Sequence, residues 1–379
     1  MFAMPTREFN TSGPCDPELH YMVPRTEVVA RGLGQIERGR FFTIFAPRQS
    51  GKTTCFQLML TELADRPEYV GTWVSFEDLA HTDPERFWVT FEKRLMRRVR
   101  ETLPEFEGPP LRQTLDLEEF AWALKDKTGR RWVLIIDEFD GTPPALLGEL
   151  LHHFRQLYHT RSDHALQSVV LVGVRNLTEV TLDHASPFNI AEELEIPYFS
   201  EEETRALVAQ YVADTGQVFE EEVLRRLHQN TAGQPGLVCA LSRDLITRFA
   251  PEPPDPVTLD SFWPLLDYYL REKIDKNISN IVNKAKQQPD LMMKVLFNGE
   301  VPFSVRDPRI AFLHVNGVVE NDRGVVDVPV PLYKQCLIVA FQPLINGEAE
   351  HYATVSTDFE DFLDGDGLNV PALLESYRR

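Results

Sequence analysis

The stretch that decides the fold is IFAPRQSGKTT, residues 44–54. An apolar run, residues 41–45, stops at a turn of small residues, and the segment at 53–64 that follows has the look of a helix. Backbone N–H groups can surround a phosphate only where small residues allow unusual dihedral angles. The positive end of the following helix favours the same anion. This strand, turn and helix therefore predict a phosphate-binding loop.

The octet from Ala46 to Thr53 matches the Walker A pattern G-x-x-x-x-G-K-[ST], except that alanine replaces the first glycine. The residues expected to surround the phosphates are Pro47, Arg48, Gln49, Ser50, Gly51, Lys52, Thr53 and Thr54. Lys52 is expected to reach the β- and γ-phosphates, and the Thr53 hydroxyl to bind Mg²⁺. The alternative is a structural turn that carries a lysine by chance, but the strand before it and the helix after it favour the functional interpretation.

A second motif, VLIIDEFDG at 133–141, ends an apolar strand in two carboxylates. This is the Walker B arrangement. Asp137 is expected to hold Mg²⁺ through water, and Glu138 to orient or deprotonate the attacking water. Asp140 is expected to cap the following turn. The alternative here is an ordinary acidic turn after a strand.

Strand-like runs alternate with helical segments in the first half of the chain. The runs lie at 41–45, 69–76, 132–139 and 168–174, with 189–199 as a fifth candidate, and the helical segments lie at 26–39, 53–64, 84–103 and 143–159. Continuous apolar runs suit strands covered on both faces, and the alternation predicts βαβ units with a parallel sheet. The fold class expected is therefore α/β.

The pattern changes after residue 200. Segments 200–212, 220–230 and 235–250 read as amphipathic helices, and Ser200 with Glu203 forms a capping-box pattern. The proline-rich segment 251–256 is the best linker candidate. Beyond it we expect a helix at 291–297, a short strand at 301–305, a helix at 307–321 and a β-rich segment at 324–341, an order that suggests a winged helix.

Bulk properties narrow the class of protein. The chain has 379 residues and a formal net charge of -19, a field that repels nucleic acid unless a local basic face exists. Its four cysteines lie far apart, which argues against a zinc site or disulfide framework and fits a reducing cytoplasm. No apolar run reaches membrane-spanning length, and no secretory signal is visible. A cytoplasmic protein with no membrane partner is expected.

Several segments together resemble the AAA+ superfamily, and most closely its STAND branch and the related archaeal and bacterial AAA-like ATPases. They are APRQSGKTT, VLIIDEFD, LVGVRN, SPFNIAEELEIPYFSEEE and TAGQPGLV, and the resemblance spans about residues 9–345. It implies a P-loop core at 1–199, a helical lid at 200–250 and a winged-helix domain at 259–345. An acidic linker and a helix would fill 346–379, where relatives often continue into an effector domain. The chain either delegates its output to a partner or is a fragment.

The resemblance also assigns roles to further residues. Arg175 resembles the sensor-1 polar residue, with Asn176 as the competing choice. Pro235, in Gly-Gln-Pro at 233–235, resembles the lid proline that packs on the nucleotide, although it also reads simply as a helix start. Tyr21 lies in the lead-in that covers the adenine in the family, and it could equally belong to the core.

Departures from the family pattern limit what carries over. The chain has VPLYKQC where many STAND proteins carry Met-His-Asp, which leaves an ADP-locked state open, and His314 reads as a core histidine. No arginine finger can be assigned, and Arg155 and Arg161 are the first positions to test.

The function implied is that of an ATP-binding, Mg²⁺-dependent ATPase with slow turnover. ATP and ADP states would set a switch read by an effector protein or by a homo-oligomer, in bacterial signalling or defence against phage. One alternative is an initiator- or loader-type AAA+ protein that acts on DNA. It is not favoured, because 300–334 holds four basic residues against five acidic ones. The other is a scaffold that binds nucleotide without hydrolysis. The preference between ATP and GTP stays open.

Overall fold

A five-stranded parallel sheet forms the centre of the first half of the chain. The computed structural model describes residues 7–46, 49–173, 191–342, 363–364 and 367–368. The strands follow the order β2-β3-β4-β1-β5. They are β1 (Phe42–Phe45), β2 (Tyr69–Ser75), β3 (Arg131–Asp137), β4 (Leu166–Gly173) and β5 (Glu192–Glu193). The parallel α/β fold is confirmed, and the fifth strand lies within the range predicted for it.

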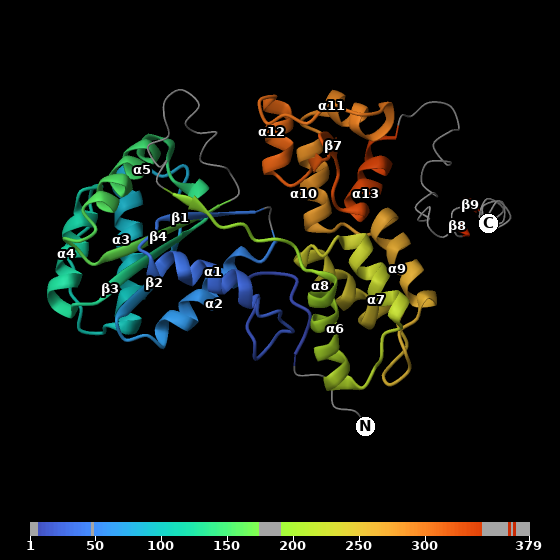
Figure 1. Cartoon of the computed structure of the whole chain (residues 1–379), viewed down its shortest axis with the longest axis horizontal. Coiled ribbons are helices and arrows are strands. Elements are labelled where there is room, and N and C mark those ends of the chain that lie inside the picture. The colour runs from blue at the N-terminus through green and yellow to red at the C-terminus, as the bar shows by residue number, and fades with distance from the viewer. Residues whose placement is uncertain (1–6, 47–48, 174–190, 343–362, 365–366, 369–379) are drawn as a thin grey trace.

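Helices cover both faces of this sheet, and we call the whole the α/β core (Figure 1). α1 (Thr26–Glu37) and α2 (Lys52–Ala64) pack on one face, and α3 (Pro84–Thr102), α4 (Asp116–Thr128) and α5 (Pro144–His159) on the other. Successive residues of β3 face opposite layers: Val133 and Ile135 contact the first set of helices, and Leu134 and Ile136 the second. Burial on both faces explains the continuous apolar run of this strand.

The carboxyl ends of the strands meet at one edge of the sheet. Phe45 at the end of β1 pairs with Gly173 at the end of β4, and Ser75 at the end of β2 pairs with Asp137 at the end of β3. Open α/β sheets bind ligands outside the carboxyl ends of their strands. The loop after β1 and the acids after β3 therefore face the same space.

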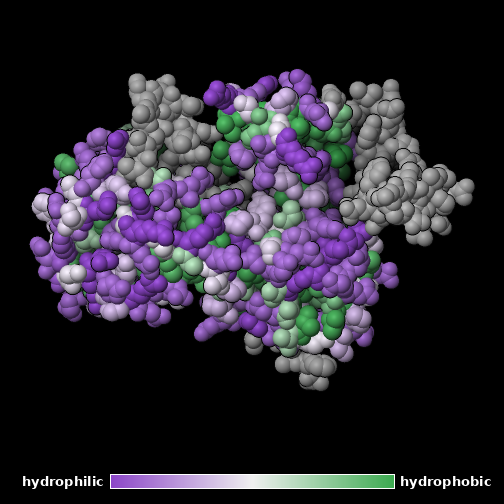
Figure 2. Space-filling model, in the orientation of Figure 1, coloured by the Kyte–Doolittle hydropathy of each residue, from purple (hydrophilic) through white to green (hydrophobic). Residues whose placement is uncertain are grey.

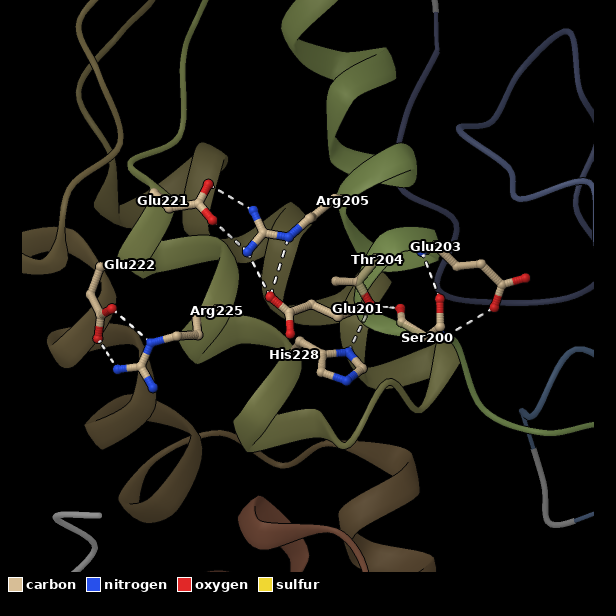
Figure 3. A network of polar contacts seen from close by, with 9 residues as sticks. All are labelled: Ser200, Glu201, Glu203, Thr204, Arg205, Glu221, Glu222, Arg225 and His228. Carbon is tan, nitrogen blue, oxygen red and sulfur yellow. Dashed lines mark hydrogen bonds and ion pairs between the residues drawn. The ribbon is translucent and has the colours of Figure 1, made fainter. Parts of the chain in front are cut away.

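Residues 201–249 form the first helical group. It consists of α6 (Glu201–Thr215), α7 (Glu221–Thr231), α8 (Pro235–Asp244) and the π-helix η2 (Leu245–Phe249). The predicted capping box is confirmed, because Ser200 Oγ accepts from the Glu203 N–H at 3.1 Å and the Glu203 carboxylate accepts from the Ser200 N–H at 3.0 Å. Arg205 then joins α6 to α7 through ion pairs of 2.6 Å with both Glu201 and Glu221 (Figure 3).

Residues 259–341 form the second helical group. Its helices are α9 (Leu259–Arg271), α10 (Lys276–Ala285), α11 (Pro289–Met293), the π-helix η3 (Lys294–Asn298), α12 (Pro308–Val315) and α13 (Pro331–Phe341). An antiparallel hairpin joins β6 (Glu320–Asp322) to β7 (Val325–Asp327). A separate pair of two-residue strands, β8 (Leu363–Asp364) and β9 (Gly367–Leu368), lies further along the chain.

Two predictions for the second helical group are wrong. The segment 324–341 is not β-rich, because β7 is its only strand and α13 occupies residues 331–341. Pro331 suits the first turn of a helix, and the buried side chains of Leu332, Cys336 and Leu337 then repeat at helical spacing. The strand expected at 301–305 is a single bridge between Pro302 and Val325.

One hydrophobic cluster runs through both helical groups and the N-terminal lead-in (residues 7–25). Phe9 and Tyr21 of the lead-in belong to the same buried cluster as Leu241 of α8 and Leu337 of α13. The two groups and the lead-in thus share one core, separate from the two cores that flank the sheet. In Figure 1 the α/β core lies to the left and the helical groups lie to the right.

The face of the molecule in Figure 2 is mostly hydrophilic. Its hydrophobic side chains gather chiefly over the second helical group, around α11 and α12 (Figure 2). Among the described residues, no helix combines the length and the apolar character that crossing a membrane requires.

Candidate functional site

The loop after β1 turns sharply into α2. Gln49 and Gly51 have positive φ angles of 56° and 88°, a geometry in which consecutive N–H groups can face one anion. α2 begins at Lys52, whose side chain is only 7% exposed and whose Nζ donates to the carbonyl of Ala46 at 2.7 Å. The lysine is therefore folded back across the loop. Ala46 is buried in the core beside α1 and α2, so its methyl group is accommodated there.

Thr53 and Asp137 lie in contact, as the two motifs require. Thr53 Oγ1 donates to Asp137 Oδ2 at 3.1 Å, although 84 residues separate them. Asp137 is 7% exposed, and this burial raises the pKa of its carboxyl group. The Glu138 N–H, the Thr53 hydroxyl and the positive charge of Lys52 oppose that rise. A cation bound here would supply the remaining compensation for the buried charge.

The chemistry of this pair suits Mg²⁺ held together with a nucleotide. Within the described residues, no three His, Cys, Asp or Glu side chains are grouped so that they could hold a metal ion by themselves. Mg²⁺ commonly binds through one or two protein oxygens and the phosphates of a substrate. A hydroxyl and a carboxylate in contact at the entrance to a phosphate loop fit that mode.

The acids that follow Asp137 lie in a tight turn. Glu138 has a φ of 51°, is half-buried, and donates its N–H to Asp137 Oδ1 at 3.0 Å. The carboxylate of Asp140 lies against Gly173 at the end of β4, where a Cβ on that glycine would be 2.7 Å from Asp140 Oδ1. Both acids therefore stand at the carboxyl edge of the sheet. A role of Asp140 as a cap of the following turn stays a prediction.

Some predicted site residues lie outside the described part of the chain. Pro47 and Arg48 of the loop are not among the described residues, and neither are Arg175 and Asn176 after β4. Their proposed roles stay predictions. Of the two arginines considered as a finger, Arg161 donates to the carbonyl of Tyr158 at the end of α5.

A pocket lies beside the start of α2, between the lead-in and the first helical group. It encloses about 680 Å³ of empty space, its open mouth included. Tyr21 and Val23 line it from the lead-in, Gly51 and Thr54 from the phosphate loop and α2, and Phe199 and Pro235 from the first helical group. Mostly apolar walls next to a phosphate loop have the character of a site for a flat base.

Tyr21 belongs both to this wall and to a core, and its role over the adenine stays a prediction. It is 1% exposed, and its ring packs on Phe9 and Tyr211 at centroid distances of 4.9 and 6.0 Å. The ring is fixed by these contacts before any ligand binds.

Gly233 and Pro235 shape the opposite wall. Gly233 has a φ of 71°, and a Cβ there would lie 2.0 Å from the carbonyl oxygen of Phe199. α8 begins at Pro235, and the Gln234 side chain accepts from the Leu237 N–H at 2.5 Å as its N-cap. The motif is thus a helix start, and it also places the proline in the pocket.

Gln49 links the phosphate loop directly to both helical groups. Its carbonyl oxygen accepts from the Gly236 N–H at 3.2 Å and from Gln234 Nε2 at 3.3 Å. Its side-chain Oε1 accepts from Asn277 Nδ2 at the start of α10. Sequence analysis missed this link because 228 residues separate Gln49 from Asn277 and no local pattern marks either as a contact.

The comparisons with known proteins agree with this geometry. Residues 35–181 match the family model described as AAA domain. The structure is similar to that of the Walker-type ATPase of Pyrococcus abyssi, with a TM-score of 0.65 and 13% identity, covering 87% of this chain and 99% of that one. No curated protein matches the sequence.

Two further structures are similar at lower scores. Cdc6p of Pyrobaculum aerophilum has a TM-score of 0.47 and 11% identity, covering 88% of this chain and 97% of that one. The RuvB Holliday junction branch migration motor of Thermotoga maritima has a TM-score of 0.44 and 14% identity, covering 80% of this chain and 90% of that one. At such identities the likeness is one of fold alone.

The strand order and the structural similarity define the fold. The α/β core has the fold of an AAA+ P-loop ATPase core, and the match to the AAA domain model lies within it. A helical region follows it along the chain.

Proposed function

We propose that the chain binds ATP with Mg²⁺, hydrolyses it slowly, and acts as a molecular switch. Lys52 would neutralise the phosphates, and Thr53 and Asp137 would hold the metal ion. Glu138 would activate water, and Arg175 would sense the γ-phosphate. The contact between Thr53 and Asp137 and the lysine folded across the loop support the first two roles. The pocket between Tyr21 and Pro235 would take the base.

The observation that carries the switch is the position of Gln49. The loop that must close around a phosphate is hydrogen-bonded through this residue to α8 of the first helical group and α10 of the second. A ligand shifts a conformational equilibrium by as much as its affinities for the two states differ. A bound phosphate that reorients Gln49 would have different affinities for the protein with and without the hydrogen bonds from Gln49 to the helical groups. Its binding would therefore shift the position of these groups.

The finer assignment rests on resemblance to the STAND branch. In it the first helical group is a lid and the second a winged-helix domain. The three helices α10, α11 and α12 followed by the β6–β7 hairpin support the second part of this assignment. The output would pass to a protein partner or to self-assembly, in a signalling or defence setting.

The test is steady-state ATP turnover with the mass of the assembly followed in parallel. Lys52→Ala is expected to lose nucleotide binding. Glu138→Gln is expected to keep binding but to lose turnover by about 100-fold or more, the usual contribution of a general base. Lys286→Ala and Glu252→Gln, both at exposed positions outside the site, serve as matched controls.

Two results would contradict the proposal in different ways. A Lys52→Ala protein that hydrolyses ATP at the wild-type rate would place the site elsewhere. If the wild type binds ATP but does not hydrolyse it, and the Glu138→Gln variant behaves in the same way, the protein is a nucleotide-bound scaffold.

A further inference from the structure

The outer face of α3 carries a line of positive charge. Arg86, Lys93, Arg97 and Arg100 are all exposed. At about 100° per residue they fall within roughly 60° of one another around the helix, and at about 1.5 Å per residue they span roughly 21 Å of its length. We call these four residues the α3 stripe.

The stripe points directly away from the core. The opposite face of α3 buries Phe87, Trp88, Phe91, Leu95 and Val99 against the sheet and α4. The stripe is therefore fixed in place by the packing of the helix that carries it, with no need to order a loop.

The four side chains of the stripe have no hydrogen bond, ion pair or ring contact with any residue that the structure describes. The arginines on the flank of the helix are different. Arg94 donates to the carbonyl of Ser75, and Arg98 pairs with Glu101 at 3.0 Å and lies 4.2 Å from the Trp73 ring centre. Only the outward charges are left without an internal role.

The setting makes this concentration of charge informative. The whole chain has 58 acidic and 39 basic residues. Its other arginines often pair with acids, as Arg205 does with Glu201 and Arg309 with Asp307. Four unpaired cations along one helix face form the local basic face without which an acidic protein repels a polyanion.

We propose that the α3 stripe binds the sugar–phosphate backbone of nucleic acid without regard to base sequence. A line of cations with no exposed aromatic or apolar residue between them suits repeated phosphates. A protein partner would favour a hydrophobic centre with aromatic side chains, which this face lacks. The proposed contact lies on the α/β core. The sequence analysis had considered DNA binding only for the second helical group.

The same helix contacts the carboxyl edge of the sheet through a residue on its flank. Arg94 contacts the carbonyl of Ser75, and Ser75 pairs with Asp137 across the sheet. A polyanion on the outer face of α3 would thus lie one helix away from the metal-binding carboxylate.

The experiment measures fluorescence anisotropy of labelled 20-nucleotide single-stranded DNA and 20-base-pair duplex DNA with the full chain. If four phosphates are neutralised, affinity falls between 50 and 200 mM salt by about 50-fold for the single strand and about 150-fold for the duplex. Lys93→Ala/Arg97→Ala removes two of the four phosphate contacts. For this variant the same change in salt should lower the affinity only about 7-fold for the single strand and about 12-fold for the duplex. The two probes show which form of the backbone is bound.

The matched control is Arg306→Ala/Arg323→Ala, which removes the same charge from exposed positions of the second helical group. It should behave as wild type. Arg86→Ala/Arg100→Ala is a second stripe variant, and thermal melting verifies that each variant is folded.

The proposal is wrong if wild type binds neither probe at 50 mM salt, or if both stripe variants keep the wild-type salt dependence. Sedimentation of the same proteins tests a different partner. Stripe variants that change the mass of the assembly and leave DNA binding unaltered would show that the stripe contacts an acidic face of a second copy.

Discussion

Replacing Asn277 by alanine is expected to speed the release of bound ADP by about 2- to 13-fold. The substitution removes the hydrogen bond from Asn277 Nδ2 to Gln49 Oε1, which holds α10 on the phosphate loop. A neutral hydrogen bond contributes about 0.5–1.5 kcal/mol net, and each 1.4 kcal/mol is about tenfold in an equilibrium. Gln49 is exposed, so its freed oxygen regains water and no burial penalty adds to this.

The assay is stopped-flow displacement of a fluorescent ADP analogue. Asn280→Ala is the matched control. Asn280 lies about one turn further along α10 and lines a small cavity together with Asn277, and it makes no side-chain hydrogen bond with a described residue. Release from this control should match wild type.

A double-mutant cycle makes the test sharper. Gln49→Ala removes the same side-chain bond but keeps the main-chain bonds to α8. If the bond carries the effect, the Gln49→Ala/Asn277→Ala protein releases ADP no faster than either single variant. Rates that multiply in the double variant, or an Asn277→Ala protein that releases ADP at the wild-type rate, would refute the reasoning.

Three further outcomes follow from the geometry. Burial raises the pKa of Asp137, so the ionised carboxylate lowers the stability of the fold above that pKa. Without nucleotide, Asp137→Asn should therefore have a higher melting temperature than wild type at pH 7. The difference between the two melting temperatures should shrink as the pH falls towards 4. Gly233→Ala, at positive φ and against the Phe199 carbonyl, should lower the free energy of unfolding in urea by about 2–3 kcal/mol, whereas Gly148→Ala in open space on α5 should raise it by about 0.5–1 kcal/mol. Ser200→Ala should cost about 1 kcal/mol in the same assay, through the lost cap, and a melt equal to wild type would exclude that role.

The parts of the fold that could be predicted are those with a local physical signal. β3 is buried on both faces, and this forces a continuous apolar run. The capping box at Ser200 pairs two residues three positions apart, so the sequence displays it directly. The phosphate loop and the acids after β3 could be placed together, because parallel strands bring their carboxyl ends to one edge.

The failures have equally specific causes. The residues of α13 form a short apolar run, in which helix and strand cannot be told apart by composition. α4 was overlooked although Leu117, Phe120, Ala121 and Leu124 repeat at helical spacing. The bond between Gln49 and Asn277 depends on how three units pack, and no window of sequence contains it. The roles of Arg175, Glu138 and Lys52 stay predictions.

The lead-in packs in the same hydrophobic core as the helical groups and makes polar contacts with α6. Arg7 pairs with Asp214 of α6 at 2.9 Å, and Gln210 of the same helix donates to the Met22 carbonyl at 3.0 Å. The backbone then enters α1 through Arg25, which has a φ of 53°. In the proposed switch, a movement of the helical groups would carry the lead-in with it about Arg25. The two walls of the proposed base pocket, Tyr21 and Pro235, would then leave the phosphate loop together, so that one rotation would be enough to release the nucleotide.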